Sequence, residues 1–338
     1  MRALYIRKPL EAEVGELEPP QAGAGEVLLR VRYVGMCGSD LSSYRGKNPL
    51  VSYPRIPGHE IAATIERVGD GVPERFQAAM AVTLSPYSSC GTCASCLRKR
   101  PNACKSNQTL GVQRDGALTD WIAVPFEKLI VAEGLQLRDL SLVEPLTVGY
   151  HAARRGRVAP GDRVMVLGCG AVGLGAIAAS AFHGATVTAV DVDDRKLALA
   201  QRAGAHAAIN SKTQNLTERI SALTDGLGPD VVIEAIGTPE TFRLAVEAVA
   251  FTGRVVYIGY AKDEVRYDSR LFVQKELDIL GSRNALPEDF EGVIRMLSET
   301  AFPLEEMVSK VVTLEQAPQA LQDWYAAPAT VSKILVEL

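Results

Sequence analysis

The stretch VMVLGCGAVG at 164–173 decides the fold of this chain. Four apolar residues lead into the pattern G-x-G-x-x-G, formed by Gly168, Gly170 and Gly173, and an acidic residue, Asp191, ends the next apolar run. The first glycine permits a tight turn, the second lets the backbone approach a pyrophosphate, and the third lets a helix pack on a strand. The pattern therefore predicts a strand, a dinucleotide-binding loop and a helix. The alternative is a structural turn that binds another ligand.

Asp191 bears on the choice of cofactor. Its carboxylate is placed to accept hydrogen bonds from ribose hydroxyls, and it would repel the additional phosphate of NADP, so we predict a preference for NAD. We assign Ala171, Val172 and Lys196 to the same cofactor site. Cys169, inside the loop, is interpreted as a small residue that fits there and not as a redox switch.

Outward from this loop, apolar runs alternate with helix-length segments, which is typical of a parallel sheet covered by helices on both faces. Residues before about 143 instead form short alternating runs broken by Gly and Pro, and this β-rich character returns in the last strand, VSKILVEL. We predict an α/β protein with a doubly wound Rossmann domain at 146–284 and a discontinuous β-rich domain at 1–145 and 285–338. The expected strands are 164–168, 185–191, 207–210, 230–237 and 254–259, and the expected helices are 194–203, 239–250 and 287–300.

Composition limits the partners. Of the 338 residues, 47% are hydrophobic and 22% charged, and the net charge of −4 comes with no basic stripe, so we expect no nucleic-acid partner. The N-terminus carries Arg7, Lys8 and Glu11 where a signal peptide would be apolar. Residues 164–190 lack charge, but five glycines interrupt them, as in a buried βαβ unit and not a membrane span. We therefore expect a cytoplasmic protein with no membrane partner.

Four of the six cysteines, Cys90, Cys93, Cys96 and Cys104, lie in one short segment. A loop of this length cannot form its own hydrophobic core, but four thiolates around Zn²⁺ would fix it. Four protein sulfurs leave no open coordination position, so we predict a structural zinc site. An iron–sulfur cluster and disulfides are the alternatives.

Two further segments contain candidate ligands for a catalytic metal. Cys37 lies in GMCGSD at 35–40, while His59 and Glu60 lie in PGHE at 57–60. A single buried cysteine or histidine usually serves packing. The combination of these residues with the cysteine tetrad and the dinucleotide loop favours a metal site instead.

The order of these motifs resembles that of the zinc-containing medium-chain alcohol dehydrogenases, over essentially the whole chain. Glu144 stands where simple alcohol dehydrogenases carry a second cysteine, which makes the sorbitol and threonine dehydrogenase branch the most similar. Two segments further resemble L-galactonate and L-gulonate 5-dehydrogenases and the starvation-sensing proteins. The motifs are CGSD (37–40), GHE (58–60), the tetrad, VEPL (143–146) and the glycine loop, and the two segments are RGKNPLVSYPRIPGHE (45–60) and GSRNALPEDFEGVI (281–294).

This resemblance implies a GroES-like β-rich domain and two zinc ions per chain. It assigns the catalytic zinc to Cys37, His59 and one or both of Glu60 and Glu144, the last acting either directly or through water. Because neighbours in an extended segment point to opposite faces, His59 and Glu60 can both bind the ion only if the chain bends. Ser39 would take the proton of the substrate hydroxyl; the alternative is a serine that caps local backbone groups.

The chain departs from the family pattern at three places. Ser42 stands where many relatives carry a proton-relay histidine, Ala63 replaces a glycine after GHE, and residues 78–82 read AAMAV in place of the usual GD-R-V. Arg283 stands where the sorbitol branch has a substrate-pocket arginine. A guanidinium there suits a sugar acid, although an ion pair between domains is an equal alternative.

The expected function is oxidation of a secondary alcohol of a polyol or sugar acid with NAD. The alternatives are a threonine-type or a simple alcohol dehydrogenase and, from another class, a catalytically silent dinucleotide-binding regulatory protein. The intact set of candidate zinc ligands disfavours the regulatory protein and a zinc-free quinone reductase. Family habit implies a homodimer or homotetramer.

Overall fold

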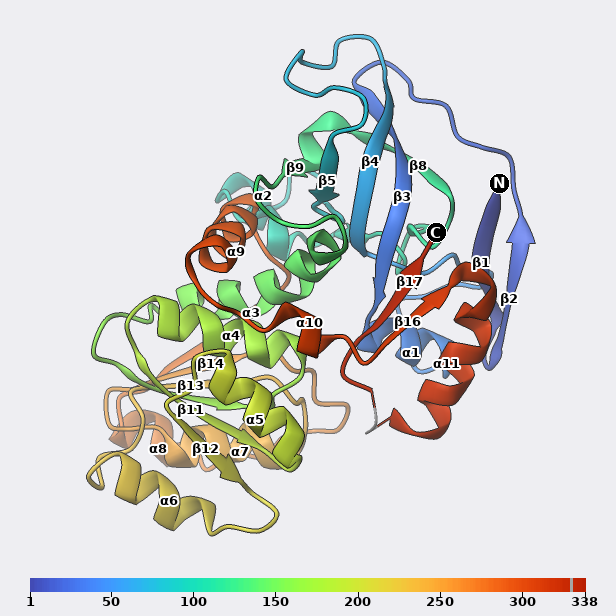
Figure 1. Ribbon diagram of the computed structural model, residues 1–338. Coiled ribbons are helices and arrows are strands. Elements are labelled where there is room, and N and C mark those ends of the chain that lie inside the picture. Colours follow the sequence, from blue (N-terminus) through green and yellow to red (C-terminus); the bar gives the residue numbers. More distant parts are fainter. Residues whose placement is uncertain (329–330) are drawn as a thin grey trace. The chain divides into compact units, whose positions relative to one another are not determined.

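The computed structural model describes residues 1–328 and 331–338. They form two compact units: Met1–Glu144 with Leu304–Leu338, and Pro145–Pro303 (Figure 1).

The first unit is built on a mostly antiparallel seven-stranded sheet in the order β16-β17-β3-β4-β5-β9, with β8 also paired to β3. Two short ribbons, β1-β2 and β6-β7, accompany it. The strands are β1 Arg2–Lys8, β2 Glu11–Glu16, β3 Glu26–Met36, β4 Glu60–Val68, β5 Ala81–Leu84, β6 Tyr87–Ser88, β7 Gln108–Thr109, β8 Trp121–Pro125, β9 Leu129–Val131, β16 Lys310–Thr313 and β17 Ile334–Glu337. Its helices are α1 Gly38–Tyr44, α2 Ala94–Leu97, α10 Leu304–Met307 and α11 Ala317–Ala326, with 3₁₀ turns η1 Pro101–Ala103, η2 Phe126–Lys128, η3 Arg138–Leu142 and η4 Leu314–Gln316.

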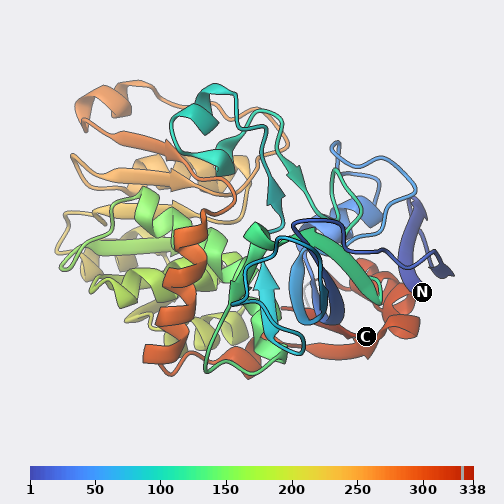
Figure 2. The ribbon, with the colours of Figure 1, turned by 90° about the horizontal axis from the view of Figure 1, so that it is seen from above.

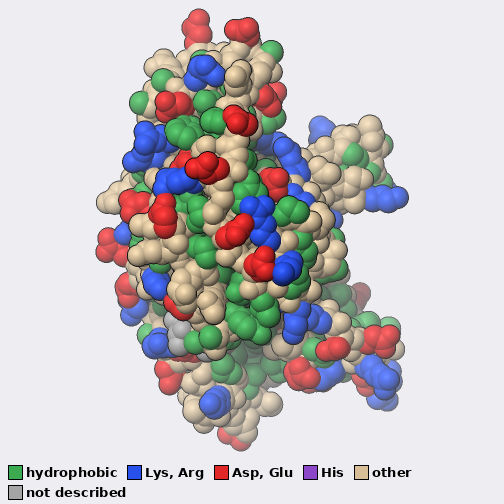
Figure 3. All heavy atoms as spheres, turned by 90° about the vertical axis from the view of Figure 1, so that its right-hand side faces the viewer, with side chains coloured by type: hydrophobic (Ala, Val, Ile, Leu, Met, Phe, Trp, Pro, Cys, Tyr) green, Lys and Arg blue, Asp and Glu red, His purple; other side chains and the backbone are tan. Residues whose placement is uncertain are grey.

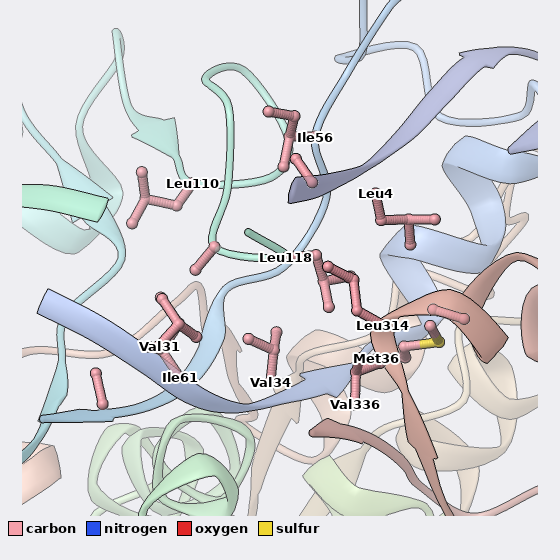
Figure 4. Close-up of a cluster of buried hydrophobic side chains, with 14 of the residues drawn as sticks. Leu4, Val31, Val34, Met36, Ile56, Ile61, Leu110, Leu118, Leu314 and Val336 are labelled. Atoms are coloured by element: carbon pink, nitrogen blue, oxygen red, sulfur yellow. The ribbon is translucent and has the colours of Figure 1, made fainter. Parts of the chain in front are cut away.

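Strand β3 is the centre of this unit. Its alternating residues Val27, Leu29 and Val31 are fully buried, as a strand with one face on a core requires. Figure 4 shows Val31, Val34 and Met36 of β3 beside side chains from other strands and from loops far away in sequence. This cluster is the hydrophobic core that fixes the register of the sheet.

That register gathers three distant segments. Strand β17 pairs antiparallel with β3, with Ile334 opposite Met36, and β4 pairs with the other edge of β3, with Glu60 opposite Gly35. The residues just beyond these pairs therefore meet at one end of the sheet.

The second unit contains a six-stranded parallel sheet in the order β12-β11-β10-β13-β14-β15, and the sequence order reverses between β10 and β13. The predicted doubly wound α/β fold is confirmed. The five predicted strands are present, and β15 is a sixth that the sequence did not indicate. The elements are α3 Val143–Arg155, whose first two residues belong to the first unit, β10 Arg163–Leu167, α4 Ala171–Phe182, β11 Thr186–Asp191, α5 Asp194–Arg202, β12 Ala207–Asn210, α6 Leu216–Leu223, β13 Val231–Glu234, α7 Pro239–Ala248, β14 Arg254–Tyr257, α8 Arg270–Gln274, β15 Asp278–Gly281 and α9 Pro287–Glu299.

The second unit extends further than the sequence predicted. The expected return to the β-rich domain at residue 285 corresponds to Leu304 in the structure, because α9 packs within the second unit (Figure 2). Asp289 of α9 accepts from Arg154 at 2.6 Å and lies 2.7 Å from His151 Nδ1, both on α3. A Cβ added at Gly292 would lie 2.5 Å from the Tyr150 ring, so α9 approaches α3 closely.

The surface carries both signs of charge. On the face in Figure 3, acidic and basic side chains are interspersed among apolar and neutral ones. In the part of the chain that the structure describes, no helix has the length and apolar character needed to cross a membrane.

Ala79 offers a test of the backbone. It precedes β5 with a φ of 68°, in the left-handed region that disfavours residues with a Cβ. We expect Ala79→Gly to raise the free energy of unfolding by about 0.5–1 kcal/mol, since the relief of the left-handed cost exceeds the added chain entropy of glycine. Urea denaturation measures the change.

Ala81→Gly is the matched control. Ala81 lies in β5 opposite Thr64, where the backbone is extended, so the same exchange should lower the free energy of unfolding. Equal destabilisation by both variants would contradict the account of Ala79.

Candidate active site

Three candidate metal ligands meet where β3 and β4 lie side by side. One ligand atom from each of Cys37, His59 and Glu60 lies within 4.8 Å of the others. His59 precedes β4, which begins at Glu60, so the alternation of an extended strand does not separate the two side chains. Gly58, with a φ of 103°, turns the chain just before them, and a Cβ there would lie 3.0 Å from the Leu118 backbone nitrogen. The chain therefore bends as it must if His59 and Glu60 are to bind the same ion.

Asp40 organises this cluster from helix α1. Its Oδ2 accepts a hydrogen bond from the Cys37 backbone N–H at 2.8 Å, and its Oδ1 lies 3.9 Å from His59 Nδ1. Burial disfavours a charged imidazole, but the Asp40 carboxylate, Cys37 and Glu144 outweigh it and raise the pKa of His59 well above its ordinary value. The acidic groups around His59 therefore favour positive charge within the cluster.

Lys333 makes a buried ion pair with Glu60. Its Nζ lies 2.6 Å from both carboxylate oxygens and 3.3 Å from the Met36 carbonyl oxygen. The register explains the contact. Strands β17 and β4 lie on opposite edges of β3, and Gly35 of β3 has no side chain to separate Lys333 from Glu60. A Cβ at Gly35 would lie 2.0 Å from Glu60 Oε2. Glycine is thus required for the carboxylate to cross β3 and reach the lysine.

Glu144 and Tyr87 form a second buried pair. Tyr87, in β6, donates its hydroxyl hydrogen bond to Glu144 Oε1, at the start of α3. Burial, followed by the facing carboxylate, raises the pKa of Tyr87 well above its usual range, and burial raises the pKa of Glu144. The carboxylate oxygens of Glu144 do not lie within 4.8 Å of all three atoms of the Cys37 cluster.

Ser39 lies in the first turn of α1, two residues from Cys37. Its Oγ is buried and has no hydrogen-bond partner among the described residues, so it does not cap local backbone groups. Asp40 makes the capping hydrogen bond instead. The Ser39 hydroxyl is available to a bound molecule.

The donor set of the cluster fits a zinc ion. A thiol, an imidazole and a carboxylate are the ligand types that Zn²⁺ binds, and three protein ligands leave one position for an exchangeable group. His59 Nδ1 and Asp40 Oδ1 are buried and lack hydrogen-bond partners in the described chain. Burying a polar atom without a hydrogen-bond partner costs free energy unless a bound ligand supplies the partner.

The tetrad forms a separate cluster. The Sγ atoms of Cys93 and Cys96 lie 3.5 Å apart, those of Cys93 and Cys104 3.8 Å, and those of Cys104 and Cys90 3.5 Å. A tetrahedral site with Zn–S bonds of about 2.3 Å has sulfurs about 3.8 Å apart. All four are free thiols, and a hydrogen bond from Ser95 helps to lower the pKa of Cys93 to about 5. The loop has the geometry of a closed metal site.

The glycine loop of the second unit has the predicted form. Gly168 has a φ of 96°, and a Cβ at Gly173 would lie 1.9 Å from the Gly168 carbonyl oxygen, so α4 begins in direct contact with the turn. A Cβ at Gly170 would meet nothing within 4 Å, which leaves its backbone open to a ligand. The Asp191 carboxylate accepts hydrogen bonds from the backbone N–H groups of Cys169 at 2.8 Å and Val192 at 2.7 Å.

The remaining candidates lie around the same unit. Ala171 and Val172 open α4, and Lys196 lies in α5. Arg283 is half-buried between β15 and α9. Its role in substrate binding stays a prediction.

Comparison with known proteins identifies both units. Residues 23–134 match the alcohol dehydrogenase GroES-like domain, and residues 171–299 match the zinc-binding dehydrogenase family. L-galactonate-5-dehydrogenase of Escherichia coli is 31% identical, covering 91% of each chain. Sorbitol dehydrogenase of Halalkalibacterium halodurans is also 31% identical, covering 91% of this chain and 90% of that one. The chain belongs to the zinc-type medium-chain alcohol dehydrogenases.

Solved structures of this family agree with the fold. The RspB alcohol dehydrogenase of Escherichia coli CFT073, complexed with NADH, has a TM-score of 0.92 and 29% identity over 100% of this chain and 99% of that one. Galactitol-1-phosphate dehydrogenase of Escherichia coli has the same score and identity, with full coverage of both. A zinc-binding dehydrogenase of Sinorhizobium meliloti bound to NADP scores 0.92 at 25% identity, over 100% of this chain and 99% of that one.

Membership of the zinc-type alcohol dehydrogenases confirms the predicted family, the Rossmann and GroES-like domains, and the use of zinc and NAD(P). The chain is an oxidoreductase of the polyol and alcohol dehydrogenase type.

Sequence reasoning missed three residues of the site in this zinc-type dehydrogenase. Asp40 lies within the CGSD motif, but no role was predicted for it. Tyr87 and Lys333 stand in no motif: Tyr87 lies in the β6-β7 ribbon, and Lys333 directly precedes β17, which pairs with β3. An isolated lysine before an apolar final strand was the only available signal for Lys333.

The Lys333–Glu60 pair leads to a stability prediction. In Lys333→Met the Glu60 carboxylate stays buried without its ammonium partner, so the free energy of unfolding should fall by about 3–5 kcal/mol. Urea denaturation measures the loss. Adding Glu60→Gln to Lys333→Met should recover part of the lost free energy of unfolding, because the unpaired charge is removed.

Lys310→Met provides the comparison. Lys310 pairs with Asp323 at 3.5 Å with both side chains about half exposed, so its loss should cost less than about 1 kcal/mol. If the two lysine variants lose the same stability, the pair at Glu60 has no special role.

Proposed function

We propose that this chain oxidises a secondary alcohol of a polyol or sugar acid with NAD, and catalyses the reverse reduction, at a zinc site formed by Cys37, His59 and Glu60. The proposal rests on the convergence of these three ligand atoms within 4.8 Å, although residue 37 lies between β3 and α1 and residues 59–60 lie at the start of β4. The relatives named for L-galactonate, sorbitol and galactitol-1-phosphate support the substrate class.

The residues of the cluster have separable tasks. When bound there, zinc supplies a Lewis acid that lowers the pKa of an alcohol hydroxyl. Ser39 Oγ, which has no hydrogen-bond partner among the described residues, accepts the hydroxyl proton while its own hydroxyl proton passes on to water. Asp40 orients Cys37 through its backbone N–H, and Lys333 fixes both oxygens of Glu60. Ser42 carries no imidazole, so water takes the proton onward.

We assign the tetrad Cys90, Cys93, Cys96 and Cys104 to a second, structural zinc, which makes two ions per chain. The sulfur spacing supports this, and four sulfur ligands exclude substrate. The loop has few buried apolar residues of its own, so its order depends on the ion.

The cofactor preference is proposed to be NAD. Three backbone N–H groups fix the Asp191 carboxylate beside the glycine loop, where a 2′-phosphate would meet its charge. Gly168, Gly170, Ala171, Val172 and Gly173 form the phosphate-binding turn, with Lys196 nearby in sequence on α5.

Arg283 is proposed to bind the carboxylate of a sugar acid, since a guanidinium binds carboxylates with two hydrogen bonds. The chain is proposed to form a homodimer or homotetramer. Strand β15 ends the six-stranded sheet and has an unpaired edge in the described chain, with Ile279 41% exposed. A second copy could cover such an edge.

A screen of polyols and aldonates for NADH formation tests the function, with zinc counted per chain. We expect turnover by the wild type, and a Cys37→Ala variant that folds and binds NADH but reduces turnover by at least a thousandfold, since a ligand of the Lewis acid is lost. Full activity of Cys37→Ala would refute the catalytic assignment.

Cys93→Ala separates the two metal sites. It should lose one zinc and unfold at a lower temperature, while the folded fraction keeps its turnover. An unchanged melting temperature with lost turnover would reverse the assignment of the two clusters. NADH binding by the wild type without turnover of any substrate would favour the regulatory alternative.

Asp191→Ser tests the cofactor preference. Removal of the carboxylate should lower the ratio of kcat/KM for NAD over NADP by at least tenfold, because the repulsion of the 2′-phosphate is relieved. Steady-state kinetics with both cofactors measure the ratio.

Asp193→Ser is its control. Asp193 caps α5 by accepting from the Arg195 N–H, a task that serine also performs, so its replacement should change the ratio much less. The assignment of Asp191 fails if its variant keeps the wild-type ratio.

A further inference from the structure

We infer that Glu234 is a positioning residue for the nicotinamide half of the cofactor, because its buried carboxyl group shapes the two turns that follow β13 and β14. Glu234 is the last residue of β13 and is fully buried. The use of NAD(P) is a property of the family. The inference rests on the proposed function only in taking the glycine loop as the phosphate-binding turn and Asp191 as the ribose ligand.

The order of the strands indicates which half of the cofactor lies at Glu234. The glycine loop follows β10, and Asp191 ends β11 on one side of it, whereas β13 and β14 lie on the other side. In an open parallel sheet a dinucleotide lies across the carboxyl ends of the strands, where the strand order reverses. A cofactor with its adenosine at β11 and its pyrophosphate at the glycine loop therefore extends its nicotinamide half over β13 and β14.

One carboxyl oxygen of Glu234 fixes the turn after β13. Oε1 accepts hydrogen bonds from the backbone N–H groups of Ile236 at 2.8 Å and Gly237 at 2.7 Å, and from the Thr241 hydroxyl at 2.8 Å. Gly237 has a φ of 88°, in the left-handed region that glycine adopts readily. The three donors connect the end of β13, the turn and the first part of α7 through one acceptor.

The same residue contacts the turn after β14. The Glu234 carbonyl oxygen accepts from the Ile258 N–H at 2.9 Å. A Cβ at Gly259 would lie 2.5 Å from Glu234 Oε2 and 2.4 Å from the Gly237 nitrogen. A Cβ at Gly237 would lie 2.8 Å from the Tyr260 nitrogen. The two turns are therefore in direct contact, and the Glu234 carboxyl group packs against both.

The two turns present apolar side chains beside the glycine loop. Ile236 is 48% exposed, and its side chain lies 2.7 Å from the position that a Cβ at Gly168 would take. Tyr260, on the second turn, is 76% exposed. Apolar side chains beside a few fixed polar groups are typical of small-molecule sites. Because Glu234 itself is fully buried, it acts on the cofactor through the backbone of these turns.

Glu234→Met tests this role, because it keeps the length of the side chain and removes the acceptor. Calorimetric titration with NADH and with ADP-ribose, which lacks nicotinamide, separates the two halves of the cofactor. We expect the wild type to bind NADH about tenfold more tightly than ADP-ribose. The variant should lose most of this ratio, while its Kd for ADP-ribose changes less than about twofold, since only hydrogen bonds on the nicotinamide side are lost.

Glu234→Gln is the conservative variant. Its amide oxygen can accept the same three hydrogen bonds, so the ratio of the two Kd values should stay near that of the wild type. Asp230→Leu is the matched control, because Asp230 directly precedes β13 at the opposite end of the strand and accepts from the Arg163 N–H at 2.8 Å. This control also removes an acidic acceptor of a backbone N–H, and it should leave both Kd values unchanged.

Glu234→Asp provides the test if the methionine variant does not fold. Its carboxyl group is one methylene shorter and cannot reach both N–H groups of the turn, so the ratio should fall while ADP-ribose binding is kept.

Four results would overturn the inference. They are a wild-type ratio in the methionine variant, or in the aspartate variant where that one is used; an equal loss of both nucleotides, which would indicate a merely structural role; a glutamine variant as weak as the methionine variant; and a wild type that binds NADH no more tightly than ADP-ribose. Failure of the proposed function looks different, because the wild type would then bind NADH more tightly than ADP-ribose and turn over no polyol or aldonate.

Discussion

A buried ammonium and carboxylate that meet across a glycine organise the catalytic half of this enzyme. Lys333 directly precedes β17 and Glu60 begins β4, two strands on opposite edges of β3, and Gly35 leaves the gap through which the two side chains touch. The contact joins the last strand of the chain to the segment that carries His59. Because an unpaired charge is costly in such a place, the pair fixes the direction of Glu60 and with it the shape of the ligand cluster.

The sequence predicted the fold because its signals are local. The glycine loop, the alternating runs and the cysteine spacing each lie within one short segment, and the structure has all of them where expected. Strand β15 was not predicted because Asp278 and the short run after it resemble a loop. Helix α9 was assigned to the wrong domain because an amphipathic pattern does not indicate which unit the helix packs on. Its buried contact from Asp289 to α3 decides that.

The candidate site was predictable only in part, because sequence signals are local and some of its contacts are not. Cys37 and His59 stand in motifs, whereas Tyr87 and Lys333 act through contacts between residues far apart in the chain. Both supply a hydrogen bond to an acid, so the site contains two carboxylates with different restraints: Glu60 held by an ammonium, Glu144 by a phenol.

Diffraction from crystals of the purified enzyme, recorded on both sides of the zinc absorption edge, tests whether zinc occupies both clusters. We expect two anomalous peaks per chain, one within the cysteine tetrad and one about 2.3 Å from the Cys37 sulfur and about 2.1 Å from a His59 ring nitrogen. A single peak, confined to the tetrad in zinc-replete crystals, would contradict this expectation.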